Sequence, residues 1–317
     1  MTIETIRTSG TPHRPEPGAA LRSVAPVMLE TAGWDDYALL DSGHGRKLER
    51  YGRFRIVRPE EQAIWTPRRP AAEWDSADAT FVGIGEDDAD GRWRYLRPVG
   101  ETWPLGYDGI RFLGRFTAFR HVGVFPEQAV HWDWLAGRIA KAGRPTKVLN
   151  LFAYTGVASL VAAQAGAEVV HIDASKKAIG WARENQEIAG MGGLPIRWIC
   201  EDAVKFVERE QRRGNRYDGV ILDPPKFGRG PKGEVWDIFT ALPNLLRACV
   251  SLLSDDPLFL ILTAYSIRAS FLSIHELAAE CLAARGGLLE SGELVIRESD
   301  RGRGLSTSLF SRWSPDG

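Results

Sequence analysis

The sequence has few cysteines, no long apolar run and almost no excess of either charge. Its three cysteines, Cys200, Cys249 and Cys281, lie far apart and form no C-x-x-C pair, so we expect reduced packing residues that are neither disulfides nor metal ligands. No apolar run reaches the length of a membrane span, and no apolar h-region follows Met1. We therefore expect a cytoplasmic protein with no membrane partner and no metal.

The charge balance also excludes a strongly basic protein. The 317 residues include 40 Lys and Arg against 41 Asp and Glu, which gives a formal net charge of -1. This balance does not indicate a nucleic-acid partner, although a local basic patch is compatible with it. With 44% hydrophobic residues, the chain is long enough for one large domain or two modest ones.

A turn that is poor in glycine is the central feature of the C-terminal part of the chain. In residues 147–156, KVLNLFAYTG, an apolar run stops at a polar turn and a helical pattern follows at once, which predicts a strand, a turn and a helix. Ligands of open parallel sheets bind beyond the carboxyl ends of the strands, so this turn should form the floor of a ligand site. Its residues are Asn150, Phe152, Ala153, Tyr154, Thr155 and Gly156.

Three later apolar runs each lead to an acid. Asp173 ends the second run, 23 residues after Asn150, where a carboxylate can accept hydrogen bonds from both hydroxyls of a ribose. Asp202 follows the third run, and Asp223 ends the fourth. Because the carboxyl ends of parallel strands share one edge of a sheet, we expect the three acids in one crevice.

Nicotinamide cofactors are the rival ligands for such a crevice. Their diphosphate needs close approach of the backbone, which G-x-G-x-x-G provides. Here the turn holds one glycine, Gly156, and the bulky Phe152 and Tyr154 occupy the space that a diphosphate needs. A nucleoside without phosphates fits better, and S-adenosylmethionine is such a molecule.

The motifs NLFAYTG, HIDAS, EDA and DPPKF follow one another between Asn150 and Phe227. In order and spacing they resemble class I S-adenosylmethionine-dependent methyltransferases, and more narrowly the bacterial 23S ribosomal RNA methyltransferases of the RlmI and RlmK kind. The resemblance covers roughly residues 112–313. It implies a Rossmann-like α/β fold with a doubly wound, seven-stranded, mostly parallel sheet. It also implies S-adenosylmethionine as cofactor and S-adenosylhomocysteine as product.

The resemblance extends to a segment before the first strand. Gly123, Phe125, Glu127 and Gln128 match the family pattern TGxFxDQR, whereas Ala129 replaces its arginine. In the family this segment lies against the methionine end of the cofactor; alternatively, it only begins a helix. The cofactor-binding residues that we expect are Gly123, Phe125, Gln128, Asn150, Phe152, Ala153, Tyr154, Thr155, Gly156, Asp173, Ala174, Ser175, Asp202, Ala203 and Asp223.

Two of these residues also suit helix starts. Asp202 should accept a hydrogen bond from the adenine amino group, while Ala203 offers its backbone N–H to a ring nitrogen. Asp202 is equally suited to be an N-cap, and both roles can hold together. Ser175 is the expected N-cap of the preceding helix.

DPPKF, from Asp223 to Phe227, is the expected transfer motif. In methyltransferases with a (D/N)PP(Y/F) motif, the acid or amide and the first proline carbonyl accept hydrogen bonds from an exocyclic amine, and an aromatic ring stacks on the base. Here Lys226 separates the prolines from Phe227. We expect Asp223, Pro224, Pro225, Lys226 and Phe227 to be the catalytic residues, with Phe227 or Tyr265 stacking on the base.

DPPKF also occurs in relatives that methylate carbon 5 of cytosine. Those enzymes need a cysteine after the fifth strand, which adds to carbon 6 of the base. In this chain the corresponding residues 263–267 read TAYSI, with no cysteine. We therefore expect methylation of a nucleobase nitrogen in ribosomal RNA without a cysteine nucleophile.

The rest of the chain divides into segments that differ in residue composition and apolar pattern. Residues 1–32 are rich in Thr, Pro, Gly and Ala and predict a flexible tail. Residues 33–110 contain short apolar runs between turn residues, which predict a small, mostly β accessory domain. Residues 111–317 form the expected methyltransferase domain. The predicted helices are 176–189, 203–213, 236–253 and 270–285, with a loop at 227–233, a buried fifth strand at 258–265 and a final edge hairpin of strands 288–296 and 306–313.

Two further expectations concern the accessory domain. Its core should include Trp34, Trp65, Trp74 and Trp93. A basic cluster, together with nearby aromatic residues, either binds RNA or forms a solvated, partly salt-bridged surface. The cluster consists of Arg46, Lys47, Arg50, Arg53, Arg55, Arg58, Arg68 and Arg69.

Two other functions stay open at this point. One is a methyltransferase that acts on a protein side chain or a small metabolite, with residues 34–103 as a lid. The other is a non-catalytic RNA-binding relative, although the retained Asp173, Asp202 and Asp223 argue against it.

Overall fold

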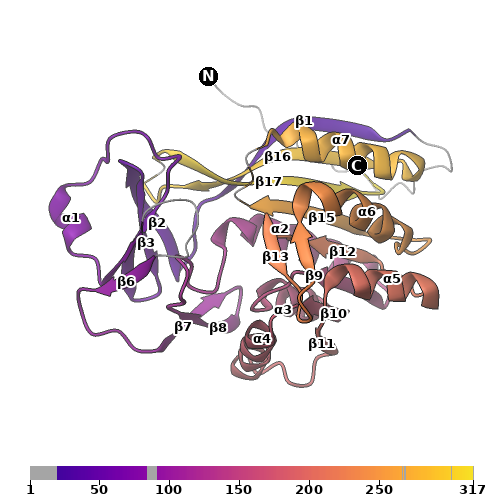
Figure 1. Ribbon diagram of the computed structural model, residues 1–317, viewed down its shortest axis with the longest axis horizontal. Coiled ribbons are helices and arrows are strands. Elements are labelled where there is room, and N and C mark those ends of the chain that lie inside the picture. The colour runs from indigo at the N-terminus through magenta and orange to yellow at the C-terminus, as the bar shows by residue number, and fades with distance from the viewer. Residues whose placement is uncertain (1–19, 84–90, 266, 268, 301, 317) are drawn as a thin grey trace.

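A large sheet and a small sheet lie side by side in the protein (Figure 1). The computed structural model describes residues 20–83, 91–265, 267, 269–300 and 302–316. The large sheet consists of β1 (Arg22–Thr31), β9 (Thr146–Leu151), β10 (Ala167–Asp173), β11 (Ile196–Cys200), β12 (Gly219–Leu222), β15 (Phe259–Tyr265), β16 (Leu288–Arg297) and β17 (Gly304–Ser314). Its strand order is β1-β16-β17-β15-β12-β9-β10-β11. Only β17 runs antiparallel to its neighbours.

Helices cover both faces of the large sheet because its central strands are apolar on both sides. Along β9, Val148 packs in the same cluster as Leu160 of α3, and the next residue, Leu149, packs with Phe206 of α5. One face is covered by α2 (Ala129–Ala142), α3 (Val157–Gln164) and α4 (Lys176–Ile188), the other by α5 (Ala203–Arg213), α6 (Ile238–Ser251) and α7 (Phe271–Leu282). The predicted doubly wound α/β fold is confirmed.

The large sheet has eight strands where seven were predicted. The additional strand is β1, which pairs in parallel with β16 from Arg22 to Thr31. The prediction of a flexible tail up to residue 32 is therefore wrong for residues 22–31, and residues 1–19 lie outside the described part of the chain. Most side chains of β1 are exposed, so the strand is held mainly by backbone pairing and lacks an apolar signature in the sequence. As a result, the hairpin β16–β17 is not the edge of the sheet.

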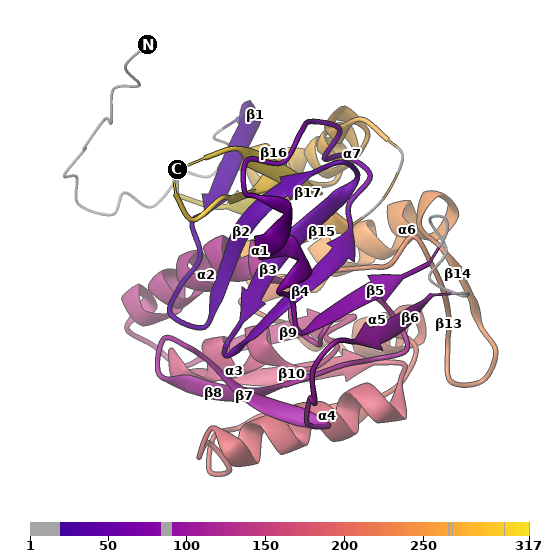
Figure 2. The ribbon, with the colours of Figure 1, turned by 90° about the vertical axis from the view of Figure 1, so that its left-hand side faces the viewer.

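The small sheet stands in front of the large one when the molecule is viewed from the left-hand side of Figure 1 (Figure 2). Its strand order is β2-β3-β4-β5-β6. One hydrophobic cluster continues from Leu39 and Ile56 of this sheet to Val148 and Val169 of the large sheet. The elements are β2 (Tyr37–Gly43), β3 (Arg46–Tyr51), β4 (Phe54–Pro59), α1 (Ala71–Asp75), β5 (Ala79–Val82) and β6 (Arg92–Tyr95), followed by the hairpin of β7 (Thr102–Tyr107) and β8 (Ile110–Arg115).

The N-terminal tryptophans are buried to different degrees. Trp74 is 6% exposed and packs in a separate cluster with Leu48 and Val57, whereas Trp34, Trp65 and Trp93 pack only partly buried against the main cluster. The predicted domain boundary after residue 110 falls within the β7–β8 hairpin. The division into two domains at that point stays a prediction.

The basic cluster of the small sheet is split by the pleat of its strands. Lys47 and Arg58 point inward and are buried, and Lys47 pairs with Glu60 at 3.0 Å. Arg58 donates from Nε and Nη2 to the two carboxylate oxygens of Glu49, at 2.7 and 2.8 Å. Two of the eight cations are thus structural and are not available to a large external partner. The exposed members are Arg46, Arg53, Arg55 and Arg68.

A small hairpin replaces the predicted loop at 227–233 and delays the next helix. Its strands are β13 (Phe227–Arg229) and β14 (Val235–Asp237), paired in antiparallel fashion. The helix predicted from residue 236 begins at Ile238, because Asp237 is its N-cap and accepts a hydrogen bond from the Thr240 N–H. The predicted helices 176–189, 203–213 and 270–285 are confirmed within three residues at each end.

The buried Arg58–Glu49 pair generates a stability prediction. Replacement of Glu49 by Ala leaves a buried guanidinium without its counter-charge and should lower the free energy of unfolding by about 3–5 kcal/mol. The matched control is Glu73→Ala, which removes the partly exposed i,i+4 pair with Arg69 and should cost less than about 1 kcal/mol. Urea unfolding of both variants measures the difference, and equal losses would contradict the prediction.

Candidate functional site

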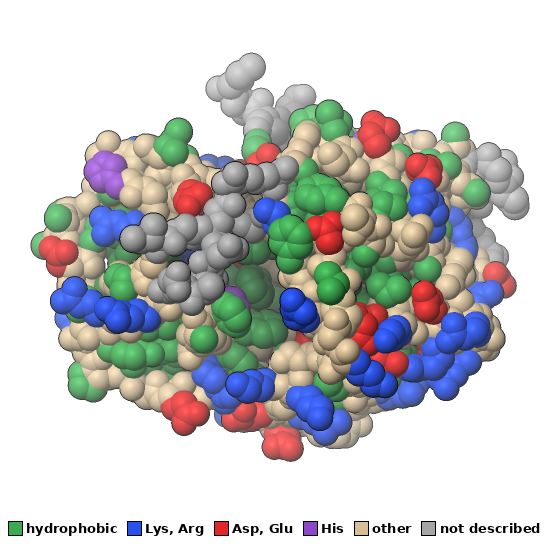
Figure 3. Space-filling view, in the orientation of Figure 1, with side chains coloured by type: hydrophobic (Ala, Val, Ile, Leu, Met, Phe, Trp, Pro, Cys, Tyr) green, Lys and Arg blue, Asp and Glu red, His purple; other side chains and the backbone are tan. Residues whose placement is uncertain are grey.

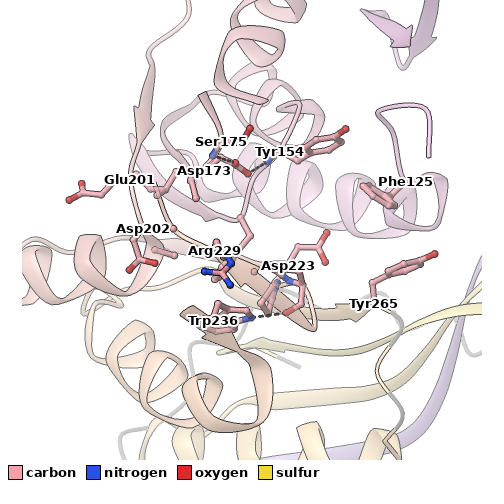
Figure 4. Close-up of a pocket in the computed structure, with 18 of the residues that line it drawn as sticks. Phe125, Tyr154, Asp173, Ser175, Glu201, Asp202, Asp223, Arg229, Trp236 and Tyr265 are labelled. Atoms are coloured by element: carbon pink, nitrogen blue, oxygen red, sulfur yellow. Dashed lines mark hydrogen bonds between the residues drawn. The ribbon is translucent and has the colours of Figure 1, made fainter. Parts of the chain in front are cut away.

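A cavity of about 490 Å³ lies at the carboxyl ends of the parallel strands β9, β10, β11, β12 and β15. Figure 3 shows a hollow between the two parts of the molecule with hydrophobic side chains on its walls, and Figure 4 shows the cavity residues at close range. Its lining consists of Phe119, Phe125, Glu127, Gln128, Phe152, Tyr154, Ile172, Asp173, Ala174, Ser175, Glu201, Asp202, Ala203, Asp223, Pro224, Pro225, Gly228, Arg229, Gly230, Trp236 and Tyr265.

The turn after β9 brings two aromatic side chains to the cavity. Phe152 and Tyr154 have φ angles of 56° and 49°, a left-handed conformation that bulky residues rarely adopt. Such strain persists where the surrounding structure holds it, commonly at functional sites. The Phe152 ring packs against Trp236, with 4.9 Å between the centroids. Phe152 and Tyr154, whose size argued against a diphosphate ligand, are therefore part of the cavity wall.

Three residues of this segment, Asn150 in β9 and Ala153 and Thr155 in the turn, lie behind the cavity lining. Asn150 is 2% exposed and donates from Nδ2 to Ser159 Oγ inside the sheet, at 2.9 Å. The Ala153 N–H donates to the Ile172 carbonyl at 3.1 Å. Thr155 donates from Oγ1 to the Gly123 carbonyl at 2.7 Å. These contacts shape the turn but place no side chain in the cavity.

Gly123 and Gly156 also lie outside the lining, and both require glycine. Gly123 has a φ of +96°, and a Cβ there would lie 2.3 Å from the Trp181 ring. Gly156 has a φ of +87°, and its Cβ would meet Ala182 and Trp198 at 3.0 to 3.1 Å. Their role in the structure is therefore close packing of the backbone.

Asp173 ends β10 and faces the cavity from one side (Figure 4). Its Oδ2 accepts a hydrogen bond from the Tyr154 N–H at 2.9 Å, and its Oδ1 accepts one from the Ser175 N–H at 2.8 Å. Each carboxylate oxygen retains a second acceptor position. Burial raises the pKa of this carboxyl, although the two N–H groups oppose the rise. The side chain is thus held in place while it can still accept from a ligand.

Asp202 and Ala203 line the cavity at the start of α5. Asp202 is the N-cap, and its Oδ1 accepts a hydrogen bond from the Lys205 N–H at 3.0 Å. Only one carboxylate oxygen is used in this contact, so the cap leaves the other one for a ligand. The neighbouring Glu201 is paired with Arg209. The cap and ligand roles expected for Asp202 are therefore compatible.

Asp223 follows β12 and is held by the segment that precedes α2. Gln128 donates from Nε2 to Asp223 Oδ2 at 3.1 Å, and its own Oε1 accepts from Thr263 Oγ1 at 3.4 Å. Glu127 is 4% exposed and also lines the cavity. Burial and, secondly, the charge of Glu127 raise the pKa of Asp223 from its ordinary value of 3.8 to about 7. Asp223 therefore changes its protonation state near neutral pH.

An aromatic wall faces Asp223. Tyr265 at the end of β15 lies against Phe125, with 5.9 Å between the ring centroids, and both residues line the cavity (Figure 4). Phe119 also lines the cavity and stacks on His121 at 5.7 Å. Burial lowers the pKa of His121 to about 4, so this imidazole is neutral at pH 7. The wall offers flat, uncharged surfaces to a planar group.

The DPPKF motif divides between the cavity and the surface. Pro224 and Pro225 line the cavity, and the Pro225 carbonyl accepts a hydrogen bond from Trp236 Nε1 at 2.7 Å. Lys226 and Phe227 do not line it, and Phe227 is 61% exposed. The structure thus brings Tyr265 to the cavity and leaves Phe227 outside.

Several residues that line the cavity were not predicted as site residues from the sequence. They come from the linker before α2, from strand ends and from the unpredicted hairpin: Phe119, Ile172, Glu201, Gly228, Arg229, Gly230 and Trp236. Glu201 stands next to a predicted site residue, so its position was a usable signal. No sequence pattern indicated that the hairpin residues line the cavity, because only the pairing of β13 with β14 directs Trp236 inward.

The charge of the lining limits what the cavity can bind. In the described part of the chain, five carboxyl groups line it, with Arg229 as the one cation. A diphosphate would be repelled there, whereas a ligand with positive charge would be attracted. A phosphate-free nucleoside that carries a sulfonium and an ammonium group fits this balance.

The described residues give two further negative results. None of their helices is both long and apolar enough to cross a membrane. Across the same residues, no group of three or more His, Cys, Asp and Glu side chains is arranged to hold a metal ion.

Comparison with known structures adds two neighbours. The crystal structure of the SAM-dependent methyltransferase from Agrobacterium tumefaciens is 58% identical, with a TM-score of 0.91 over 99% of this chain and 100% of that one. SMU.776, a putative methyltransferase complexed with S-adenosylhomocysteine, is 17% identical, with a TM-score of 0.69 over 88% of this chain and 75% of that one. At this identity, the second neighbour shows the fold alone.

Curated relatives match only part of this chain. The ribosomal RNA large subunit methyltransferase K/L of Syntrophotalea carbinolica is 33% identical over 196 residues, which are 61% of this chain and 26% of that protein. The protein of the same name from Shewanella frigidimarina is 34% identical over 150 residues, 47% of this chain and 20% of that protein. The chain thus spans about a quarter or less of the length of these relatives.

The family is shown by a match over most of the chain. Residues 43–276, about three quarters of the sequence, match the family described as S-adenosylmethionine-dependent methyltransferase. The strand order and the acids at the carboxyl edge of the sheet agree with that match. The chain therefore belongs to the S-adenosylmethionine-dependent methyltransferase family.

Proposed function

We propose that this methyltransferase modifies a nucleobase nitrogen in ribosomal RNA, and that it does so without a cysteine nucleophile. The observation that carries the proposal is that Asp223, Pro224 and the aromatic residue Tyr265 line the same cavity. An acceptor pair opposite a flat aromatic surface suits a planar base that carries an amine.

The cofactor would be held by the three acids and the turn after β9. S-adenosylmethionine supplies an electrophilic methyl group on a sulfonium when it is bound. Asp173 would accept hydrogen bonds from the ribose hydroxyls, and Asp202 one from the adenine amino group. Phe152 and Trp236 would offer apolar contact. Phe125 and Gln128 would lie against the amino-acid end, as the family resemblance implies.

Asp223 would position the amine and accept its proton. The Gln128 amide holds one carboxylate oxygen of Asp223, which leaves the other one available to a ligand in the cavity that Asp223 lines. The Pro225 carbonyl is occupied by Trp236, so the Pro224 carbonyl would be the second acceptor. As the bond from nitrogen to the methyl carbon forms and the bond from sulfur to that carbon breaks, the nitrogen would release a proton to Asp223. The positioning itself would supply much of the rate.

No cysteine is placed for the carbon 5 mechanism. Cys200 ends β11 and its Sγ lies 3.5 Å from the Ala174 carbonyl, behind the lining. Cys249 is buried in α6, and Cys281 lies on α7. Within the described residues, none of the three lines the cavity. This supports attack by a nitrogen lone pair, which needs no covalent intermediate.

The assignment to ribosomal RNA rests on relatives. The curated proteins that match this chain are named as ribosomal RNA large subunit methyltransferases, but they are four to five times longer than the matched part. The direct test is a reconstituted assay with ribosomal RNA from cells that lack the protein, followed by mass spectrometry of nucleosides. Transfer to a protein or metabolite fraction in place of RNA would contradict the proposal.

Asp223→Ala should lower kcat for RNA methylation at least about a hundredfold, since the amine loses its main positioning acceptor. The affinity for S-adenosylhomocysteine, measured by calorimetry, should change far less. Unimpaired methyl transfer by this variant would refute the role of Asp223.

The pKa of about 7 predicts a pH dependence. A protonated Asp223 cannot accept the proton of the amine, so the single-turnover rate should rise with pH, be half-maximal near pH 7 and level off above pH 8. The effect on stability has the opposite sign. The raised pKa favours the protonated folded state, so the contribution of Asp223 to stability is lost as pH rises from about 4 to about 7.

Asp223→Asn tests that sign independently of catalysis. Relative to wild type, this variant should gain free energy of unfolding at pH 8 and not at pH 4, as urea titration would show. The exposed Asp255→Asn is the matched control and should show no such difference between the two pH values. A gain that is equal at both pH values would mean that Asp223 does not titrate as inferred.

Asp173→Asn should weaken S-adenosylhomocysteine binding at least about tenfold, because hydrogen bonds to a charged carboxylate contribute about 1.5–3 kcal/mol each. Calorimetric titration gives the dissociation constant. Glu168→Ala, at an exposed acid on the same strand, is the control and should leave the affinity unchanged. Equal affinities of all three proteins would remove Asp173 from the cofactor site.

A further inference from the structure

Phe227 has the position of a surface contact residue. It is the last residue of the DPPKF motif, whose first three residues line the cavity, yet it is 61% exposed. Exposure of a phenyl ring on a stable hairpin costs free energy in water, which is regained when a partner covers it.

The pleat of the hairpin Phe227–Asp237 separates an inner face from an outer face. Gly228 pairs with Trp236, and both line the cavity. Phe227 and Val235 lie on the opposite face, and Val235 is 78% exposed. Phe239, at the start of α6, is 54% exposed. The hairpin thus has one side against the cofactor cavity and an apolar side toward solvent.

Cations surround this apolar face. Lys226 Nζ lies 5.4 Å from the centroid of the Phe227 ring. Arg229 and Lys232 are exposed, and their side chains make no ion pair with any residue that the structure describes. Arg229 also reaches the rim of the cavity. The outer face therefore combines one exposed ring with three positive charges.

The acids of the hairpin are already engaged. The Glu234 carboxylate accepts from Lys205 Nζ and from the Lys232 N–H, the latter at 2.8 Å. Asp237 caps α6 through the Thr240 N–H at 3.1 Å. Neither acid is paired with Arg229 or with the Lys232 ammonium. The face keeps an uncompensated positive charge, which favours an anionic partner.

We propose that the outer face of the hairpin Phe227–Asp237 is a docking site for a single-stranded segment of the RNA substrate. Phe227 stacks on an unpaired base next to the target nucleotide, while Arg229 and Lys232 bind the adjacent phosphates. Single-stranded RNA is recognised by this combination of an aromatic platform and cations along the backbone. The inference rests on the proposed function and deepens it.

Docking at the hairpin has a kinetic signature. A residue that binds the flanking RNA equally in the ground state and the transition state changes KM and leaves kcat unchanged. A residue that stacks on the target base inside the cavity changes kcat. The split between the two constants therefore separates the surface role of Phe227 from a catalytic role.

The first test compares Phe227→Ala with Met28→Ala, which shortens an exposed apolar side chain on β1, outside the hairpin. Stacking of one base contributes about 1–3 kcal/mol, so Phe227→Ala should raise the dissociation constant for a ribosomal RNA fragment, and KM, by about 5- to 150-fold. The kcat at saturating RNA and the affinity for S-adenosylhomocysteine should stay at wild-type values. Met28→Ala should match wild type in all four constants.

The second test compares Lys232→Glu with Lys141→Glu, an exposed lysine at the end of α2. Lys232→Glu should weaken RNA binding and reduce the slope of log affinity against log salt by about 1, whereas Lys141→Glu should leave the slope unchanged.

The outcomes distinguish this inference from the proposed function. If wild type methylates ribosomal RNA and Phe227→Ala keeps its KM, the docking site is refuted and the proposed function stands. A fall in kcat without a rise in KM would place Phe227 in the transfer site and refute the docking role. If wild type neither binds nor methylates ribosomal RNA, the proposed function itself is refuted.

Discussion

The carboxylate of Asp173 is the contact on which the shape of the site depends. It accepts one hydrogen bond from the turn after β9, at Tyr154, and one from the residue that caps α4, Ser175. Two neighbouring strand ends and the start of a helix are joined at one partly buried group. The left-handed conformations of Phe152 and Tyr154 cost free energy, and this anchor helps to offset that cost. Because the carboxylate also faces the cavity, the group that holds the turn is the one that a ribose would meet.

The far end of the cavity depends on a linker between the two sheets. Arg58 of the small sheet donates from Nη1 to the Arg120 carbonyl at 3.2 Å, and Thr155 donates to the Gly123 carbonyl. Further along, Gln128 donates to Asp223. The linker is therefore fastened at three points to separate parts of the chain. The small sheet thus contributes to the site through the position of this linker, which supplies Phe125 and Glu127 to the lining.

The positions of the acids at the strand ends were predictable from the sequence, whereas the exposed position of Phe227 was not. In a parallel sheet the carboxyl ends of the strands meet at one edge, so the runs that end in Asp173 and Asp223 determined which side chains would converge. Phe227 comes only four residues after Asp223, but the pairing of β13 with β14 turns its ring outward. In that pairing the partner of Phe227 is Asp237, ten residues later. β1 was missed for a related reason, because it is held by backbone hydrogen bonds to a strand more than 250 residues later.

The sequence by itself determined the alternation of strands and helices, the order of the acids and the unsuitability of the first turn for a diphosphate. These properties follow from local apolar periodicity and from side-chain size, which each residue carries into any fold. Only the tertiary structure decided that Asn150 lies inside the sheet, that Lys47 and Arg58 are buried, and that Trp236 faces the cavity. Each of these depends on which distant segment covers the residue, because burial and strand pairing are properties of contacts between segments and not of the segments themselves.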